Sequence, residues 1–168
     1  MKIPICTFDA KTGILCAKCE SKLKLGQLKQ ADVEGAIKLT KLADRNQDVN
    51  KFTMIGGAKV DGDFVLILRS SDISALRSNT TLPIKFEHEF QSKVWFVEAE
   101  ATDKRFIENL FFPMKVLTVN LIWLPDGSKL TRVQIASKSN NSESKDTIEK
   151  IKKIAKEIRN IELLVEFV

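Results

Sequence analysis

Three cysteines and one aspartate near the start of the chain have the spacing of a metal-binding knuckle. Cys16 and Cys19 are separated by two residues, which lets both thiolates bind one tetrahedral metal ion. Cys6 could supply a third sulfur, and Asp9 stands where a second two-residue spacing would place a fourth ligand. The segment therefore predicts a zinc site at Cys6, Cys16 and Cys19, with Asp9 as the weaker fourth ligand because structural zinc prefers sulfur and imidazole.

Two other interpretations of these cysteines remain open. The knuckle could be vestigial, with its cysteines serving as small buried apolar residues. A redox role for Cys16 and Cys19 has less support, because no strand–helix–strand pattern surrounds the pair. A disulfide framework is disfavoured by the odd number of cysteines, three, and by the lack of a recognisable export signal.

The composition permits contact with nucleic acid without demanding it. The 168 residues include 27 basic and 22 acidic side chains, for a formal net charge of +5. No apolar run approaches the roughly 18 residues that a membrane-spanning helix needs. The N-terminal residues also lack the apolar core of a signal peptide, so we expect a soluble, cytoplasmic protein that makes no contact with membranes.

The sequence carries no recognisable catalytic signature. The single histidine, His88, has no catalytic partner at a readable spacing, which excludes most histidine-based schemes. Phosphate-binding, dinucleotide-binding and zinc-protease motifs are also missing. Glu98 and Glu100 share one face of a predicted strand, but two neighbouring carboxylates without a pocket are weak evidence of catalysis. We therefore expect neither enzymatic activity nor a small-molecule substrate.

The elements that must position these residues occur in the same order twice. In the first half, apolar residues at spacings of three and four predict a helix from Asp32 to about Ala43. Two strands are predicted at 52–60 and 64–68, joined by the turn signal Asp61-Gly62. Two short helices at 72–76 and 83–90 and a strand at 93–100 complete this half.

The second half repeats this order with one small helix fewer. It is predicted to contain a helix at 103–112, strands at 115–124 and 130–136, a helix at 146–160 and a strand at 161–168. Along the first of these strands, Leu117, Val119, Leu121 and Trp123 lie on one side. We assign both tryptophans, Trp95 and Trp123, to core or subunit packing.

The repeated order predicts an α+β fold of two tandem type II KH-like domains. Each domain would be a three-stranded sheet backed by helices. The predicted organisation is a cysteine-containing head at 1–30, a first KH-like domain at 31–101 and a second at 102–168.

Several segments resemble the archaeal NusA-like transcription proteins. Residues 4–6 and 11–16, with Cys19, resemble the short zinc-knuckle head of those proteins. Residues 94–100, 105–110 and 116–127 resemble the end of their first KH domain and the start of their second. The resemblance implies a tandem KH protein that acts in transcription elongation or termination and contacts RNA or RNA polymerase.

The chain departs from this pattern at the loops that bind RNA. A KH domain holds nucleic acid with a GXXG loop, whose glycines let backbone amides approach the phosphates. Neither the first such loop, at 77–80, nor the second, within 138–144, contains a glycine. Side chains are then the candidates for RNA contact, namely Arg77, Ser78, Asn79, Thr80, Lys85, Lys138 and Lys145.

Loss of the glycines leaves two functional alternatives. The protein could bind RNA weakly through these side chains, or the loops could be ordinary solvated turns. In the second case the protein would be an adaptor that kept the KH scaffold and binds other proteins instead.

Overall fold

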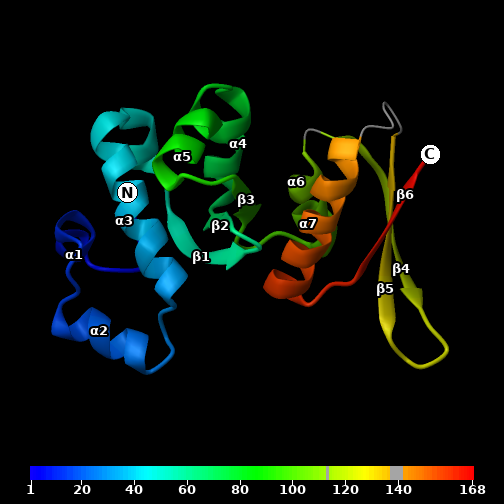
Figure 1. Cartoon of the computed structure of the whole chain (residues 1–168), viewed down its shortest axis with the longest axis horizontal. Coiled ribbons are helices and arrows are strands. Elements are labelled where there is room, and N and C mark those ends of the chain that lie inside the picture. Colours follow the sequence, from blue (N-terminus) through cyan, green and yellow to red (C-terminus); the bar gives the residue numbers. More distant parts are fainter. Residues whose placement is uncertain (113, 137–141) are drawn as a thin grey trace. The chain divides into compact units, whose positions relative to one another are not determined.

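The computed structural model of the chain describes residues 1–112, 114–136 and 142–168, without the side chains of 142–144. Its contacts divide the chain into two compact units, Met1–Glu100 and Ala101–Val168 (Figure 1). Each unit contains one three-stranded sheet. Among the described residues, no helix is both long and apolar enough to cross a membrane.

The sheet of the first unit combines one antiparallel and one parallel pair of strands. β1 (Met54–Val60) pairs antiparallel with β2 (Asp63–Leu68), and β2 pairs parallel with β3 (Val94–Glu98). The predicted hairpin turn is confirmed, because Asp61 and Gly62 have positive φ values of 53° and 84°. Such a turn suits the twist of the two strands, and glycine adopts it without steric cost.

Three helices and a short 3-10 helix accompany this sheet. They are α3 (Gln30–Arg45), η1 (Gln47–Lys51), α4 (Ser70–Ser78) and α5 (Leu82–Phe90). The sequence analysis predicted α3, α4 and α5 in this order, although α4 extends beyond the predicted 72–76 at both ends. The long helix α3 packs against β1, and a short connection joins α4 to α5.

A close backbone approach joins α3 to the sheet. A Cβ atom on Gly35 would lie 2.7 Å from Cε of Met54 and 2.9 Å from Cζ of Phe64, so a side chain at this position would require these neighbours to shift. Asp32, in the first turn of α3, accepts hydrogen bonds from the backbone N–H groups of Lys29 at 2.9 Å and Gly57 at 2.8 Å. The same carboxylate therefore caps the helix and ties it to β1.

Aromatic rings fill the core of the first unit, and the cysteine segment contributes to that core. Phe52 stacks on Phe86 with ring centroids 6.1 Å apart, and Phe64 meets Phe90 edge-on at 4.9 Å. The segment ahead of α3 adds four buried residues to the same cluster, namely Ile5, Ala10, Cys19 and Leu28. The start of the chain is thus packed into this unit.

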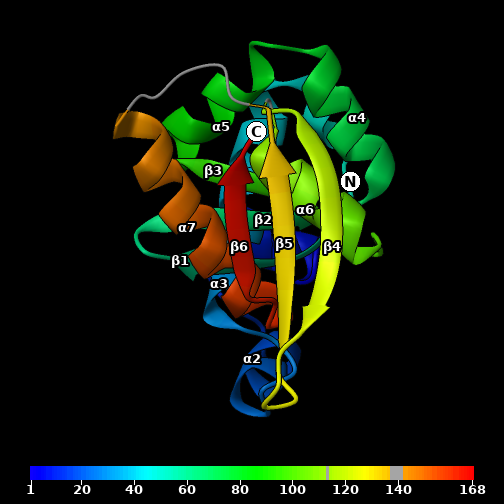
Figure 2. The same ribbon diagram turned by 90° about the vertical axis from the view of Figure 1, so that its right-hand side faces the viewer.

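The second unit repeats the strand arrangement of the first. β4 (Val116–Trp123) pairs antiparallel with β5 (Lys129–Ile135), and β5 pairs parallel with β6 (Leu163–Phe167). Figure 2 shows β5 between the other two strands. Helices α6 (Asp103–Phe111) and α7 (Ser142–Arg159) pack with this sheet. The predicted α+β fold of two three-stranded mixed sheets with helices is confirmed.

The two tryptophans differ sharply in environment. Trp95 is buried on β3, and its indole N–H donates a hydrogen bond to the Asp63 carboxylate at 3.1 Å. Trp123, at the end of β4, is 62% exposed, and Nζ of Lys129 lies 4.5 Å from its ring centroid. Core packing is therefore correct for Trp95 and wrong for Trp123, because the end of β4 lies outside the packed core of its unit, and subunit packing of Trp123 stays a prediction.

Candidate metal centre and inter-helix loop

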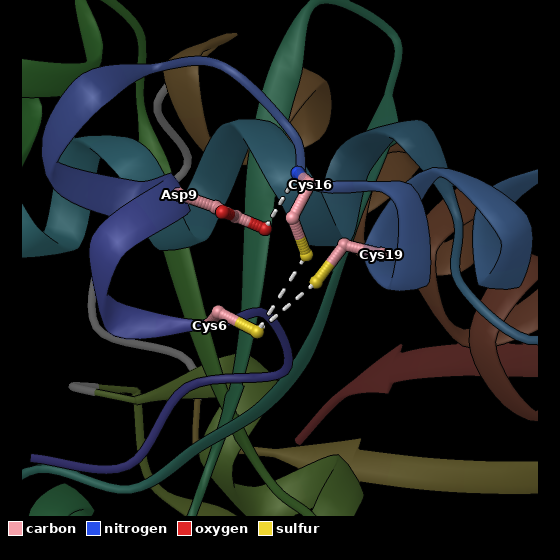
Figure 3. Close-up of side chains that lie close together, drawn as sticks. All are labelled: Cys6, Asp9, Cys16 and Cys19. Carbon is pink, nitrogen blue, oxygen red and sulfur yellow. Dashed lines mark hydrogen bonds between the residues drawn. The ribbon is translucent and has the colours of Figure 1, made fainter.

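Two short helices bring the four predicted metal ligands together. Cys6 caps α1 (Thr7–Thr12), which contains Asp9, and Cys16 caps α2 (Ala17–Lys24), which contains Cys19. Each helix thus offers one ligand at its cap and another three residues later. Figure 3 shows the four side chains converging from these two helices.

The distances in this cluster match a tetrahedral site. The Sγ atom of Cys6 lies 3.5 Å from that of Cys19 and 4.0 Å from that of Cys16. All four ligand atoms, with one oxygen from Asp9, lie within 4.8 Å of one another. Zinc–sulfur bonds of about 2.3 Å in tetrahedral geometry place neighbouring sulfurs about 3.8 Å apart. The cluster could therefore hold a metal ion such as zinc.

Hydrogen bonds orient the aspartate toward the cysteines. Asp9 is buried, and its Oδ2 accepts a hydrogen bond from the backbone N–H of Cys16 at 3.1 Å (Figure 3). The Cys19 thiol and this N–H lower the pKa of Asp9, so the carboxylate is charged at neutral pH. In return, the hydrogen bond between the protonated thiol and this carboxylate raises the pKa of Cys19 to about 12. Metal binding would therefore have to displace the Cys19 proton.

The burial of the cluster suits a structural ion more than a catalytic one. Asp9 and Cys19 are buried, Cys16 is half-buried, and only Cys6 is exposed. The four protein groups can complete a tetrahedron without water, as in structural zinc sites. Metal bound here would link α1 to α2. Because Cys19 also belongs to the core cluster, the bound metal would also stabilise the core of the first unit.

The loop between α4 and α5 uses no backbone conformation that requires glycine. Arg77 and Ser78 end α4, Asn79 and Thr80 form the connection, and Thr81 caps α5. None of these residues has a positive φ. Oδ1 of Asn79 accepts hydrogen bonds from the backbone N–H of Thr81 at 3.2 Å and from its hydroxyl at 2.8 Å. One amide of the connection is thus already satisfied by the protein itself.

The remaining predicted RNA contacts are scattered. Lys85 lies on α5, exposed, and its Nζ donates to Oδ1 of Asn46 at 2.9 Å. Lys145 lies exposed on α7 of the second unit, and Lys138 falls outside the described residues. Within the first unit, the structure brings Lys85 and the loop residues to the same pair of helices, α4 and α5.

A cavity beside this loop is the feature that sequence reasoning missed. It has a volume of about 480 Å³, and its walls come from η1, α4 and the start of α5. The lining residues are Asp48, Lys51, Phe52, Arg69, Ser71, Asp72, Ala75, Ser78, Asn79 and Leu82. Of these residues, only Ser78 and Asn79 are among the RNA contacts predicted from the sequence. No sequence motif connects Lys51 to Arg69, because only the fold brings them together.

Arg69 is positioned at this cavity by the protein around it. Its guanidinium donates to the backbone carbonyl of Lys51 at 3.0 Å and to the carboxylate of Asp72 at 3.4 Å. Asp72 is buried and also accepts the backbone N–H of Thr53 at 2.7 Å. The Arg69 guanidinium is therefore held in place beside the inter-helix loop by Lys51 and Asp72.

Fold and cluster together define an α+β protein with two mixed three-stranded sheets and an N-terminal cysteine-containing segment. No protein-family model matches the chain, and no curated protein matches it significantly. Among solved structures, it is similar to the crystal structure of APE1850, with a TM-score of 0.51 and 10% sequence identity. The match covers 78% of this chain and 95% of that one. At this identity the similarity concerns the fold alone.

Proposed function

We propose that the chain is a non-catalytic, NusA-like transcription elongation or termination factor that binds RNA, RNA polymerase or both. The proposal is supported by the sequence resemblance and by the repeated strand arrangement of the two units. The observation that carries it is the α4–α5 connection. A KH domain carries its nucleic-acid-binding loop between two helices, and here the connection between two helices contributes Asn79 to the cavity that contains Lys51 and Arg69.

RNA binding at this place would depend on side chains. Lys51 and Arg77 can neutralise phosphates, while Ser78 and Asn79 can form hydrogen bonds with a nucleotide in the cavity. The backbone contributes little, because the amide of Thr81 is capped by Asn79. Binding should therefore be weak and tolerant of sequence. It should also depend strongly on salt, since each phosphate contact releases counterions.

The capped loop favours a second function, that of a protein-binding adaptor. A connection whose hydrogen bonds are satisfied internally has less need of a phosphate ligand. On this alternative the two KH-like units are a scaffold for binding RNA polymerase or another protein, and RNA is not a ligand.

Two measurements distinguish these functions. In the first, the protein is recovered from native extract with and without nuclease, and RNA polymerase subunits should remain bound after nuclease treatment. In the second, fluorescence anisotropy follows the binding of single-stranded RNA at increasing salt. Two phosphate contacts predict a fall in affinity of about sevenfold between 50 and 200 mM salt. Loss of polymerase with nuclease together with no detectable RNA binding would contradict the proposal. Tight, salt-resistant binding of one RNA motif would contradict weak binding through side chains.

A further inference from the structure

The strand β4 has an unusual edge. Its eight residues, Val116–Trp123, contain neither a charged side chain nor a proline. Among the described residues it pairs with β5 alone, so its other edge presents backbone N–H and C=O groups without a strand partner. Natural edge strands usually carry charges or prolines, because these prevent pairing with another chain.

Large apolar side chains accompany this edge. Leu117, Leu121 and Trp123 are 46%, 54% and 62% exposed. Leu121 and Trp123 lie on one face of the strand, opposite Thr131 and Lys129 of β5. Both an unpaired backbone edge and exposed apolar groups therefore occur on the same strand.

The corresponding strand of the first unit is protected. β1 contains the charged residue Lys59 and packs closely against the 16-residue helix α3. In the second unit the corresponding helix, α6, has only nine residues. The same fold thus shields one edge strand and leaves its counterpart uncharged and exposed.

We propose that β4 pairs with β4 of a second copy of this chain, joining two three-stranded sheets into one sheet of six strands. Pairing must be antiparallel about a two-fold axis, as in other symmetric dimers. A register irregularity at Val116–Thr118 confines regular pairing to 118–123. Placing Leu121 opposite Leu121 of the second copy also places Val119 opposite Trp123, which buries apolar groups against one another.

The residues of β4 itself fit a second copy. About a two-fold axis at Leu121 the apolar side chains of one strand meet those of the other, and no like charges stand opposite each other because β4 is neutral along its whole length. The whole chain has a net charge of +5, so two copies repel each other over much of their surface. Self-association is therefore expected where the surface carries no charge.

Sedimentation velocity of the full chain across the micromolar range tests this interface. We expect a reversible monomer–dimer equilibrium. Leu121→Lys should raise the dissociation constant at least about tenfold, because it places two cations near the two-fold axis. Asn120→Lys, an exposed position on the opposite face, should act similarly without altering the apolar face. Ile55→Lys is the matched control, since Ile55 is an exposed apolar residue of edge strand β1.

Tryptophan fluorescence supplies a second measurement. Trp95 is already buried, so a shift to shorter wavelength with rising concentration would report burial of Trp123. The proposal is overturned if the chain stays monomeric throughout. It is also overturned if neither β4 variant weakens the dimer, if Ile55→Lys weakens it equally, or if Trp123 stays accessible to quencher in the dimer.

Discussion

The carboxylate of Asp9 accepts the backbone N–H of Cys16 at 3.1 Å, so one predicted metal ligand is oriented by the backbone of another. This bond connects the two short helices independently of any metal ion. It also holds an anionic group among three cysteines, where it can either coordinate a cation directly or accept hydrogen bonds from the thiols.

If Asp9 is a ligand, Asp9→Asn should weaken zinc binding. The amide keeps the shape of the side chain and can still accept the N–H of Cys16, but it lacks the negative charge. We expect about one zinc ion per wild-type chain and an affinity loss of at least about tenfold in the variant, because even groups that only orient a ligand cost about that much when they are mutated. Competition with a chromophoric chelator measures this loss, and Asp44→Asn, on an exposed part of α3, is the control. Unchanged affinity would show that Asp9 does not coordinate the ion.

Removing the metal should loosen more than the cysteine segment. Ile5, Ala10 and Cys19 share a core with α3 and the sheet of the first unit, and Lys2 bridges Thr53 beside β1. After chelation, we expect faster hydrogen exchange in α1 and α2 and also in α3, while α7 keeps its protection. Exchange that accelerates only before residue 25 would contradict this coupling.

Stability of the first unit should fall in acid because of Glu34. A hydrogen bond from Lys59 at 2.6 Å lowers its pKa, and Lys38 at 3.3 Å contributes further. A lowered folded-state pKa gives stability that is complete above the unfolded value, 4.5, and is lost as pH falls through the folded value. With Lys59 mostly exposed, the effect is about 1 kcal/mol or less.

Denaturant unfolding between pH 2 and 7 measures this contribution. Glu34→Gln should flatten the acid dependence of the first unit. The matched control, Glu149→Gln, changes an exposed glutamate on α7 and should leave that dependence unchanged. Identical pH profiles for Glu34→Gln and the wild-type protein would exclude the proposed contribution.

A methyl group at Gly35 should destabilise the first unit. The added Cβ would lie within 3 Å of side-chain atoms of Met54 and Phe64, both buried in the core. Overpacking of this kind costs about 1–3 kcal/mol, which exceeds the gain in helix propensity from glycine to alanine. Thermal unfolding of Gly35→Ala should therefore occur at lower temperature. An unchanged or higher midpoint would indicate that α3 can move away from the sheet at little cost.

Charge reversal near the inter-helix loop should remove RNA binding. Arg77→Glu with Lys85→Glu replaces two cations on α4 and α5 by anions, so residual binding at low salt should be lost. Recovery of RNA polymerase from nuclease-treated extract should not change. The control carries the same reversal at Lys11 and Lys24 of the cysteine segment. Equal loss of RNA binding in both variants would point to a general charge effect.

The repeated order of elements could be predicted because its signals are local. The spacing of apolar residues predicts α3, and Asp61-Gly62 predicts the β1–β2 hairpin. The helix α1 was missed, because six residues with no side-chain cap give too short a pattern to recognise. The two-residue spacing also predicts that Cys16 and Cys19 lie close together. Their distance from Cys6, in contrast, depends on how α1 and α2 pack.

Other parts of the candidate sites depend on tertiary structure. Lys51 and Arg69 line one cavity although β1 and β2 separate them in sequence. The exposure of Trp123 was likewise unpredictable, because an alternating strand gives the same pattern whether or not a helix covers its end. Periodicity identifies the faces of a strand, and only the lengths of the packed helices determine how much of a face is covered.

The compact spacing of the metal ligands has a consequence for the order of folding. All four lie within residues 6–19, so closing the site requires only a short loop with a small entropic cost. The parallel pairing of β2 with β3 instead waits for Val94, after two further helices have been synthesised. During synthesis, a metal-bound head can thus be complete while the sheet is still missing a strand. Ile5, Ala10 and Cys19 then offer α3 a preformed apolar surface as it emerges.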